Sequence, residues 1–128
     1  MGRRRGARKL ALDILYQSDL SHAPVEEVLQ RYEGNPGFEF AEKLVRGVDD
    51  HREELDRLIA KHAQEWSIDR MPILDRNLLR IAIFEMLNVD DVPNAVAINE
   101  AVELARIYST EDSSRFINGI LGAVASST

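Results

Sequence analysis

The amino-acid sequence predicts an all-α fold. Apolar residues recur at spacings of three and four along most of the chain, which is the period of an amphipathic helix. No segment has the alternating pattern of a convincing strand. The stretch 73–87, ILDRNLLRIAIFEML, is apolar on nearly every side of a helical wheel, so we expect a central helix wrapped by others. The 128 residues suit one domain, with two small bundles as the alternative.

The first predicted helix runs from about residue 4 to residue 21, where its apolar positions form one face. Pro24 can begin a second, shorter helix, because proline is tolerated in a first helical turn. The segment 33–37, EGNPG, is the clearest loop in the sequence, since glycine, asparagine and proline all favour turns.

The helical period continues from about residue 40 to residue 62, with a charged interruption at 49–52. One long helix or two helices with a kink both fit this pattern. Two are favoured, because Asp50 and Glu53 resemble a capping pair and Gly47 lowers the helix propensity just before them.

Residues 66–71 are expected to form a turn or a short helical piece before the central helix, which Pro72 can start. Arg80 and Glu85 are charged residues inside this apolar segment. We interpret them as partners for side chains of neighbouring helices, because buried charges are normally paired.

Two further helices are predicted, over residues 95–108 and after Thr110, giving six or seven in total. Gly119 and Gly122 fall on the polar side of the last helix. Glycines at such positions allow either a ligand to approach the backbone or a neighbouring helix to pack tightly.

The charge distribution is uneven. Five of the 16 basic residues come before the first acidic one, although the whole chain has a net charge of −6. The protein is therefore expected to have an acidic body and a basic tip over residues 1–9. Such a tip would attract a polyanion such as nucleic acid to a localised surface.

Catalysis is not predicted. The sequence has no cysteine, which excludes thiolate metal sites and a cysteine nucleophile, and it has no glycine-rich phosphate loop. His22, His51 and His62 lack the clustered partners of a metal site. We expect no metal, no cofactor and no enzyme activity. The absence of an apolar membrane span or signal sequence favours a cytoplasmic protein.

The basic tip continues into the first helix, where Arg5, Lys9 and Tyr16 fall within about 40° of one another. Cationic side chains bind phosphates and an aromatic ring stacks an unpaired base, so this face favours single-stranded RNA over duplex RNA. Phe116 is either a second stacking platform or a core residue at the rim. The alternative for the tip is a solvated tail that aids solubility.

Four segments carry a resemblance to a known family: RRRGARKLALDILYQSDL, FAEKLVRGVDDHREELDRLI, ILDRNLLRIAIFEML and VPNAVAINEAVELARIYSTEDSSRFINGIL. Together they resemble the NusB family of bacterial transcription antitermination factors, over nearly the whole chain. The last two segments are the most specific. This chain ends where the catalytic domain of NusB-like RNA methyltransferases would begin.

The resemblance implies two three-helix bundles packed at a steep angle around the central helix. It also implies a non-catalytic factor that binds the boxA element of nascent ribosomal RNA leaders as a heterodimer with NusE, a small-subunit ribosomal protein. This pair would act in an RNA polymerase complex with other Nus factors. The residues implied in RNA binding are Arg3, Arg4, Arg5, Arg8, Lys9, Tyr16, Asp112, Phe116 and Asn118.

Asp75, Arg76 and Glu100 are weaker candidates, either for contact with the partner or for ion pairs within the fold. The main rival function is a helical adaptor or homodimer whose arginines only keep it soluble. A reader of duplex DNA is less favoured, because no scaffold helix with the short turn of a helix-turn-helix precedes the first helix.

Overall fold

The computed structural model describes residues 2–64 and 66–127, with only the backbone for residues 2 and 3. Seven α-helices and one short 3₁₀ helix, η1 (Ile68–Arg70), make up the described residues, in which no strand occurs. The all-α prediction is confirmed. The helices are α1 (Gly2–Ser21), α2 (Val25–Gln30), α3 (Phe38–Asp50), α4 (Arg52–His62), α5 (Ile73–Asn88), α6 (Asn94–Tyr108) and α7 (Glu111–Ser126).

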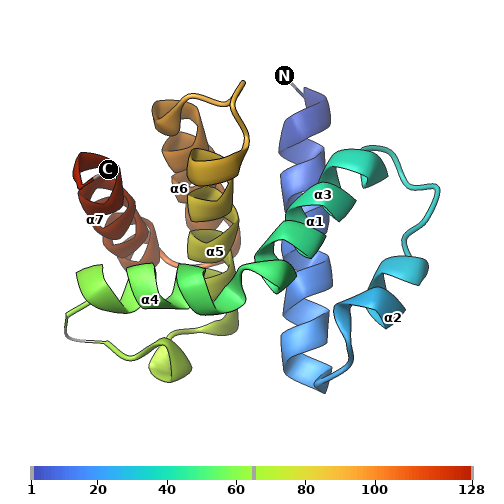
Figure 1. Ribbon diagram of the computed structural model, residues 1–128, viewed down its shortest axis with the longest axis horizontal. Helices are drawn as coiled ribbons and strands as arrows, with labels where there is room; N and C mark the ends of the chain where they lie inside the picture. The colour runs from blue at the N-terminus through green and yellow to red at the C-terminus, as the bar shows by residue number, and fades with distance from the viewer. Residues whose placement is uncertain (1, 65, 128) are drawn as a thin grey trace.

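The helices lie in two groups that share α5 (Figure 1). Helices α1, α2 and α3 pack together on one side, and α6 and α7 pack against each other and against α5 on the other. Helix α4 crosses from the first group to the second and contacts α5 and α7. Because α1 and α3 also pack on α5, the basic tip is held beside the second group.

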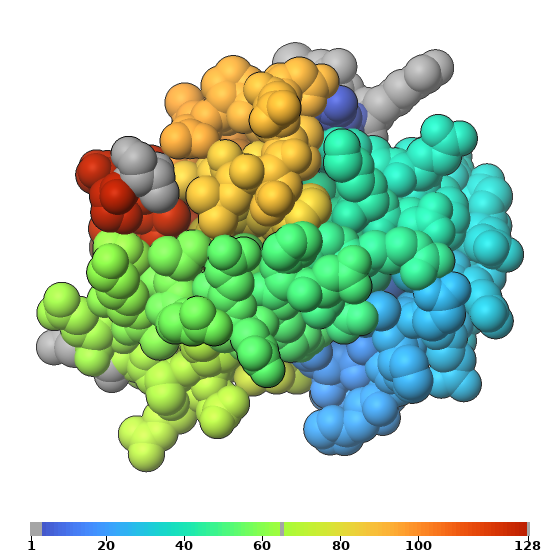
Figure 2. Space-filling view, viewed as in Figure 1, coloured from blue at the N-terminus to red at the C-terminus, as the bar shows by residue number. Residues whose placement is uncertain are grey.

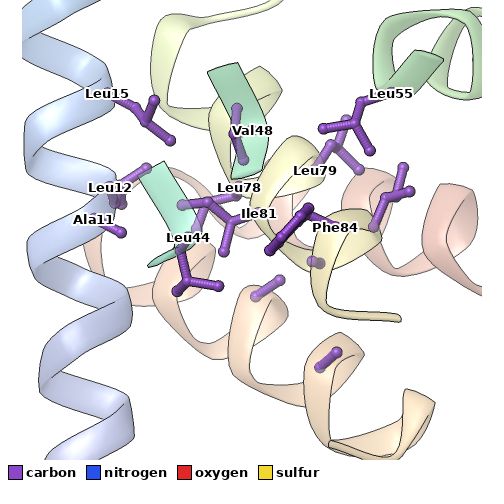
Figure 3. Packing of buried hydrophobic residues seen from close by; sticks show 14 of the residues in the cluster. Ala11, Leu12, Leu15, Leu44, Val48, Leu55, Leu78, Leu79, Ile81 and Phe84 are labelled. Carbon is purple, nitrogen blue, oxygen red and sulfur yellow. The ribbon is translucent and has the colours of Figure 1, made fainter. Parts of the chain in front are cut away.

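Helix α5 is the buried centre that its sequence predicts. Every side chain from Asn77 to Glu85 is buried, on all sides of the helix. Leu78, Ile81 and Phe84 lie among residues of α1 and α3 such as Leu12 and Leu44 (Figure 3). Pro72 lies one residue before the helix as its N-terminal cap rather than inside the first turn.

Two helices, α3 and α4, occupy the segment in which one or two were possible. They meet at His51, whose φ of −111° is not helical. The predicted capping pair is wrong, because Asp50 ends α3 and His51 caps α4 without a side-chain hydrogen bond. Gly47 has a different role from the expected one. A Cβ atom there would lie 2.1 Å from Cζ of Phe84, so the glycine lets α5 approach α3 closely.

The charged residues of the central helix are paired, as predicted. Arg80 donates from Nε to Asp56 Oδ1 at 2.7 Å and from Nη1 to Asp19 Oδ2 at 3.2 Å. Burial alone would raise the pKa of Asp19. The hydrogen bond from Asn77 and the charges of Arg52 and Arg80 outweigh burial, so the pKa lies below its usual value. Glu85 pairs with Arg8 of α1.

The glycines of α7 lie on an open surface. No described atom outside the immediate helix backbone would come within 4 Å of a Cβ at Gly119 or Gly122. Tight packing of a neighbouring helix is therefore not their role within the described residues. None of the described helices is long and apolar enough to cross a membrane.

Candidate nucleic-acid interface

Three basic residues at the start of α1 reach the surface, and each has an acidic neighbour. Arg5 donates from Nε and Nη2 to the two carboxylate oxygens of Glu100, at 3.0 and 2.8 Å. Lys9 Nζ lies 2.8 Å from Asp13, and Arg4 Nη2 lies 3.1 Å from Asp91. A phosphate that binds these exposed cations competes with a carboxylate for each of them. The side chain of Arg3 lies outside the described residues.

Arg8 differs from its neighbours, because it is only 4% exposed. Its guanidinium donates from Nε and Nη2 to Glu85 at 2.8 and 2.7 Å, and it lies 3.7 Å from Glu100. Arg8 thus ties α1 to α5 and α6. The structure does not support the expected surface contact between Arg8 and RNA, since this arginine is already paired inside the fold.

Helical geometry placed Lys9 and Tyr16 on one face, and both side chains are half-buried at the surface of α1. Lys9 Nζ also lies 4.6 Å from the centre of the Tyr108 ring, at the end of α6. Tyr108 is exposed and was not predicted as a site residue. This face therefore offers one aromatic ring, Tyr108, beside a lysine, and a second, Tyr16, about two turns further along α1. Such rings and a cation can contact bases and phosphates together.

A slot of about 320 Å³ lies between the start of α7 and the segment before α5. Its aromatic residues are Trp66 and Phe116, whose ring centroids are 6.4 Å apart and whose planes meet at 74°. Trp66 is 51% exposed. The remaining lining residues are Met71, Pro72, Asp75, Asp112 and Ser113. Because the two rings already touch edge to face, a planar base can stack on the exposed Trp66 but not between the two rings.

Asp75 holds one wall of the slot in place. It is buried, and its two carboxylate oxygens accept hydrogen bonds from Ser109 at 2.9 Å and Ser113 at 2.7 Å. Thr110 caps α7 by accepting a hydrogen bond from the backbone N–H of Ser113. These bonds fix the turn between α6 and α7 and so orient Phe116, one turn further along α7.

The other predicted residues are placed as follows. Asp112 is exposed on the rim of the slot, whereas Asn118 is exposed but does not line it. Arg76 Nε lies 3.4 Å from Asp19, and Glu100 pairs with Arg5 and Arg8. For these last two residues the structure shows ion pairs within the fold, which was one of the two roles expected.

Helix α6 joins the basic face of α1 to the slot. Along it, Glu100 contacts Arg5 and Tyr108 lies beside Lys9. Ser109, the residue after Tyr108, donates a hydrogen bond to Asp75 in the wall of the slot. The cations of α1 and the exposed Tyr108 thus lie along α6, and the residue after this helix holds a buried wall of the slot. We refer to Arg5, Lys9, Tyr16 and Tyr108 as the α1–α6 face.

Sequence reasoning missed Trp66 and Tyr108. Trp66 precedes a 3₁₀ turn in a segment without a regular period, so no pattern predicts which residues it meets. Tyr108 is the last residue of its helix, and the periodicity of that helix predicted only which residues face the core. The available signal was that Trp66 is the one tryptophan of the chain and lies in an expected connection.

The sequence was compared with known proteins. A family profile described as the NusB family matches residues 5–126. A transcription antitermination protein NusB from Salinispora arenicola is 53% identical over 131 residues, covering 98% of this chain and 96% of the relative. A NusB from Myxococcus xanthus is 44% identical, covering 98% and 96%.

Solved structures agree in fold. A solved structure of T. maritima NusB has a TM-score of 0.85 at 34% identity, covering 96% of this chain and 90% of that one. A structure of the antitermination factors NusB and NusE in complex with dsRNA has a TM-score of 0.86 at 31% identity, covering 100% and 99%. On the family profile and these identities, the chain belongs to the NusB family.

Proposed function

We propose that this protein is a non-catalytic transcription antitermination factor that binds the boxA element of nascent ribosomal RNA leaders together with NusE. Family membership supports the role in antitermination. A solved relative in complex with NusE and dsRNA supports NusE and RNA as partners, and the single-stranded form of the RNA is inferred from the slot. The pair acts in the bacterial cytoplasm, in an RNA polymerase complex with other Nus factors that resists termination.

The observation that carries this proposal is the connection of the aromatic slot to the basic face of α1 along α6. RNA phosphates replace the carboxylates that now neutralise Arg4, Arg5 and Lys9. An unstacked base enters the slot and stacks on the exposed Trp66, whose ring packs edge to face against Phe116. Because a base inside a duplex is not free to enter such a slot, the recognised element is single-stranded.

The end of α1 and the end of α6 also expose apolar side chains, Leu20 and Ile107. On the α1 wheel, Leu20 falls beside Tyr16. We assign these two exposed side chains to contact with NusE, since a protein partner covers apolar residues more readily than RNA does. A homodimer that buries the same residues is the alternative.

Fluorescence anisotropy tests the function. A labelled single-stranded boxA RNA, a scrambled strand and a boxA duplex are titrated with this protein, alone and with NusE, at one fixed salt concentration. We expect the single-stranded boxA to bind tightest and NusE to strengthen that binding. Equal affinity for boxA and the scrambled strand in the presence of NusE would contradict the proposal. Preference for the duplex would contradict its single-stranded part.

Tyr16→Ala is expected to weaken boxA binding by about 1–3 kcal/mol, the contribution of one stacked base. Tyr16→Phe keeps a ring and should bind nearly as well as the unaltered protein. The dissociation constants are measured by anisotropy after circular dichroism has shown that both variants are folded. If folded Tyr16→Ala binds as tightly as Tyr16→Phe, Tyr16 does not contact RNA.

Glu100→Gln is expected to strengthen RNA binding about two- to fivefold, because it frees Arg5 from a competing carboxylate. Glu27→Gln serves as the control, because Glu27 is an exposed residue of α2 and its loss removes the same charge away from the α1–α6 face. Both affinities are measured at several salt concentrations. An equal gain in the two variants would mean that net charge alone, rather than release of Arg5, is responsible.

A further inference from the structure

A second hollow lies at the N-terminal end of α1, outside the α1–α6 face. It has a volume of about 970 Å³ and runs between α1 and the start of α3. Arg4 lines it from α1, and Phe38, Phe40 and Lys43 line it from α3. The loop 34–37, which connects α2 to α3, completes it. We call this hollow the N-terminal groove.

The groove combines cations with an aromatic ring. The guanidinium carbon of Arg4 lies 4.5 Å from the centre of the Phe40 ring, so the guanidinium group lies over the face of that ring in a cation–π contact. Lys43 is one turn further along α3 and is exposed. Among the described residues, Lys43 takes part in no ion pair. Glu39 is the one carboxylate among the residues that line the groove.

Asp91, from the connection between α5 and α6, is the carboxylate that a ligand would have to displace. It forms a hydrogen-bonded ion pair of 3.1 Å with Arg4. The hydrogen bond and charge of Arg4, with a smaller contribution from Lys43, hold the pKa of Asp91 below its usual value. Both side chains of the pair are well exposed, at 43% and 69%. Exposed pairs contribute little to stability, so a phosphate can replace Asp91 at small cost.

The groove continues from the α1–α6 face. Arg4 lies in the groove, and Arg5, the next residue, lies on the α1–α6 face with Glu100. The N-terminal end of α1 lies between the α5–α6 connection and the start of α3 (Figure 2). A strand bound along α1 therefore meets the groove as soon as it passes Arg5.

We propose that the N-terminal groove binds the nucleotides that flank the recognised RNA element, so that the single strand extends past Arg4 onto α3. This inference rests on the proposed function. Lys43 and Arg4 contact phosphates, and a flanking base stacks on the guanidinium plane of Arg4 above Phe40. Once Asp91 leaves Arg4, the groove presents two cations, Arg4 and Lys43, against one carboxylate, Glu39, which on a chain of net charge −6 favours a polyanion at this place.

The test compares three labelled RNAs with the protein–NusE complex: the boxA element alone, and boxA extended by several nucleotides at either the 5′ or the 3′ end. The altered residue is Lys43, which is not part of the α1–α6 face. Lys43→Gln removes its charge, and Lys61→Gln removes the same charge from an exposed position near the end of α4 as the control.

We expect one extended RNA to bind about three- to tenfold tighter than boxA alone, with a steeper salt dependence. Lys43→Gln should lose most of that gain while leaving the affinity for boxA alone unchanged. Lys61→Gln should keep the gain. The side that shows the gain, 5′ or 3′, gives the direction in which the strand crosses α1.

Each contrary result has a separate meaning. Equal affinity for all three RNAs, or an undiminished gain in Lys43→Gln, would overturn the inference and leave the proposed function intact. Failure of the unaltered complex to bind boxA alone would overturn the proposed function and the inference with it. If Lys43→Gln instead weakened the binding of NusE without RNA, the groove would belong to an acidic protein segment, and the RNA assignment would be wrong.

Discussion

Replacing Arg8 by alanine is expected to destabilise the protein by about 3–5 kcal/mol, the usual cost of breaking a buried ion pair. The variant leaves the Glu85 carboxylate, which is only 1% exposed, without the guanidinium that binds it in a bidentate manner. A charge buried without a partner loses its hydration and gains nothing in return. Chemical denaturation measures the effect as a lower midpoint at an unchanged slope.

Arg5→Ala is the matched control, because Arg5 makes the same type of two-pronged pair at the surface. It should unfold close to the unaltered protein, because Glu100 keeps Arg8 at 3.7 Å and water can reach its carboxylate once Arg5 is gone. If Arg8→Ala were as stable as Arg5→Ala, the guanidinium of Arg8 would not be the partner that Glu85 requires.

A double variant separates the stability of the fold from RNA binding. In Arg8→Met/Glu85→Leu, apolar side chains replace the buried pair, which is often neutral or stabilising. We expect it to recover most of the stability lost in Arg8→Ala and to bind boxA with an unchanged salt dependence. A salt slope lower by about 0.7, the value for one phosphate of a single strand, would show that Arg8 does contact RNA.

Most of the helices could be predicted because their signals are local. The all-round apolar pattern of 73–87 indicated a buried centre, and α5 is that centre. The charged interruption at 49–52 indicated a break, and α3 and α4 do meet at His51. The role of Gly47 could not be predicted, because it depends on Phe84, which belongs to another helix.

The candidate site shows the same division between local and distant signals. A helical wheel puts Arg5, Lys9 and Tyr16 on one face, since all three belong to α1. It cannot show that Arg8 is buried, because its partners Glu85 and Glu100 belong to α5 and α6. The slot was missed for a similar reason: Trp66 reaches Phe116 only through the packing of a connecting segment against α7.

The close contact between α3 and α5 gives the second large expected effect. Gly47→Ala is expected to destabilise the protein by about 3 kcal/mol, at the upper end of the usual cost of overpacking a core. The added methyl group would lie 2.1, 2.3 and 2.6 Å from three atoms of the Phe84 ring. The ring is 5% exposed, so it can move only by displacing other core residues. This cost exceeds the gain of about 1 kcal/mol in helix propensity.

Two variants make the Gly47 prediction specific. Gly119→Ala, in α7, meets no described neighbour within 4 Å and should stabilise the protein by about 0.5–1 kcal/mol. Phe84→Leu, which shortens the opposing side chain, should make Gly47→Ala less costly than it is alone, because contacting residues are not additive. Denaturation of the unaltered protein, Gly47→Ala, Phe84→Leu and the double variant gives this coupling energy. Additive effects of Gly47→Ala and Phe84→Leu would contradict a direct contact, and α3 would then not require glycine where it crosses α5.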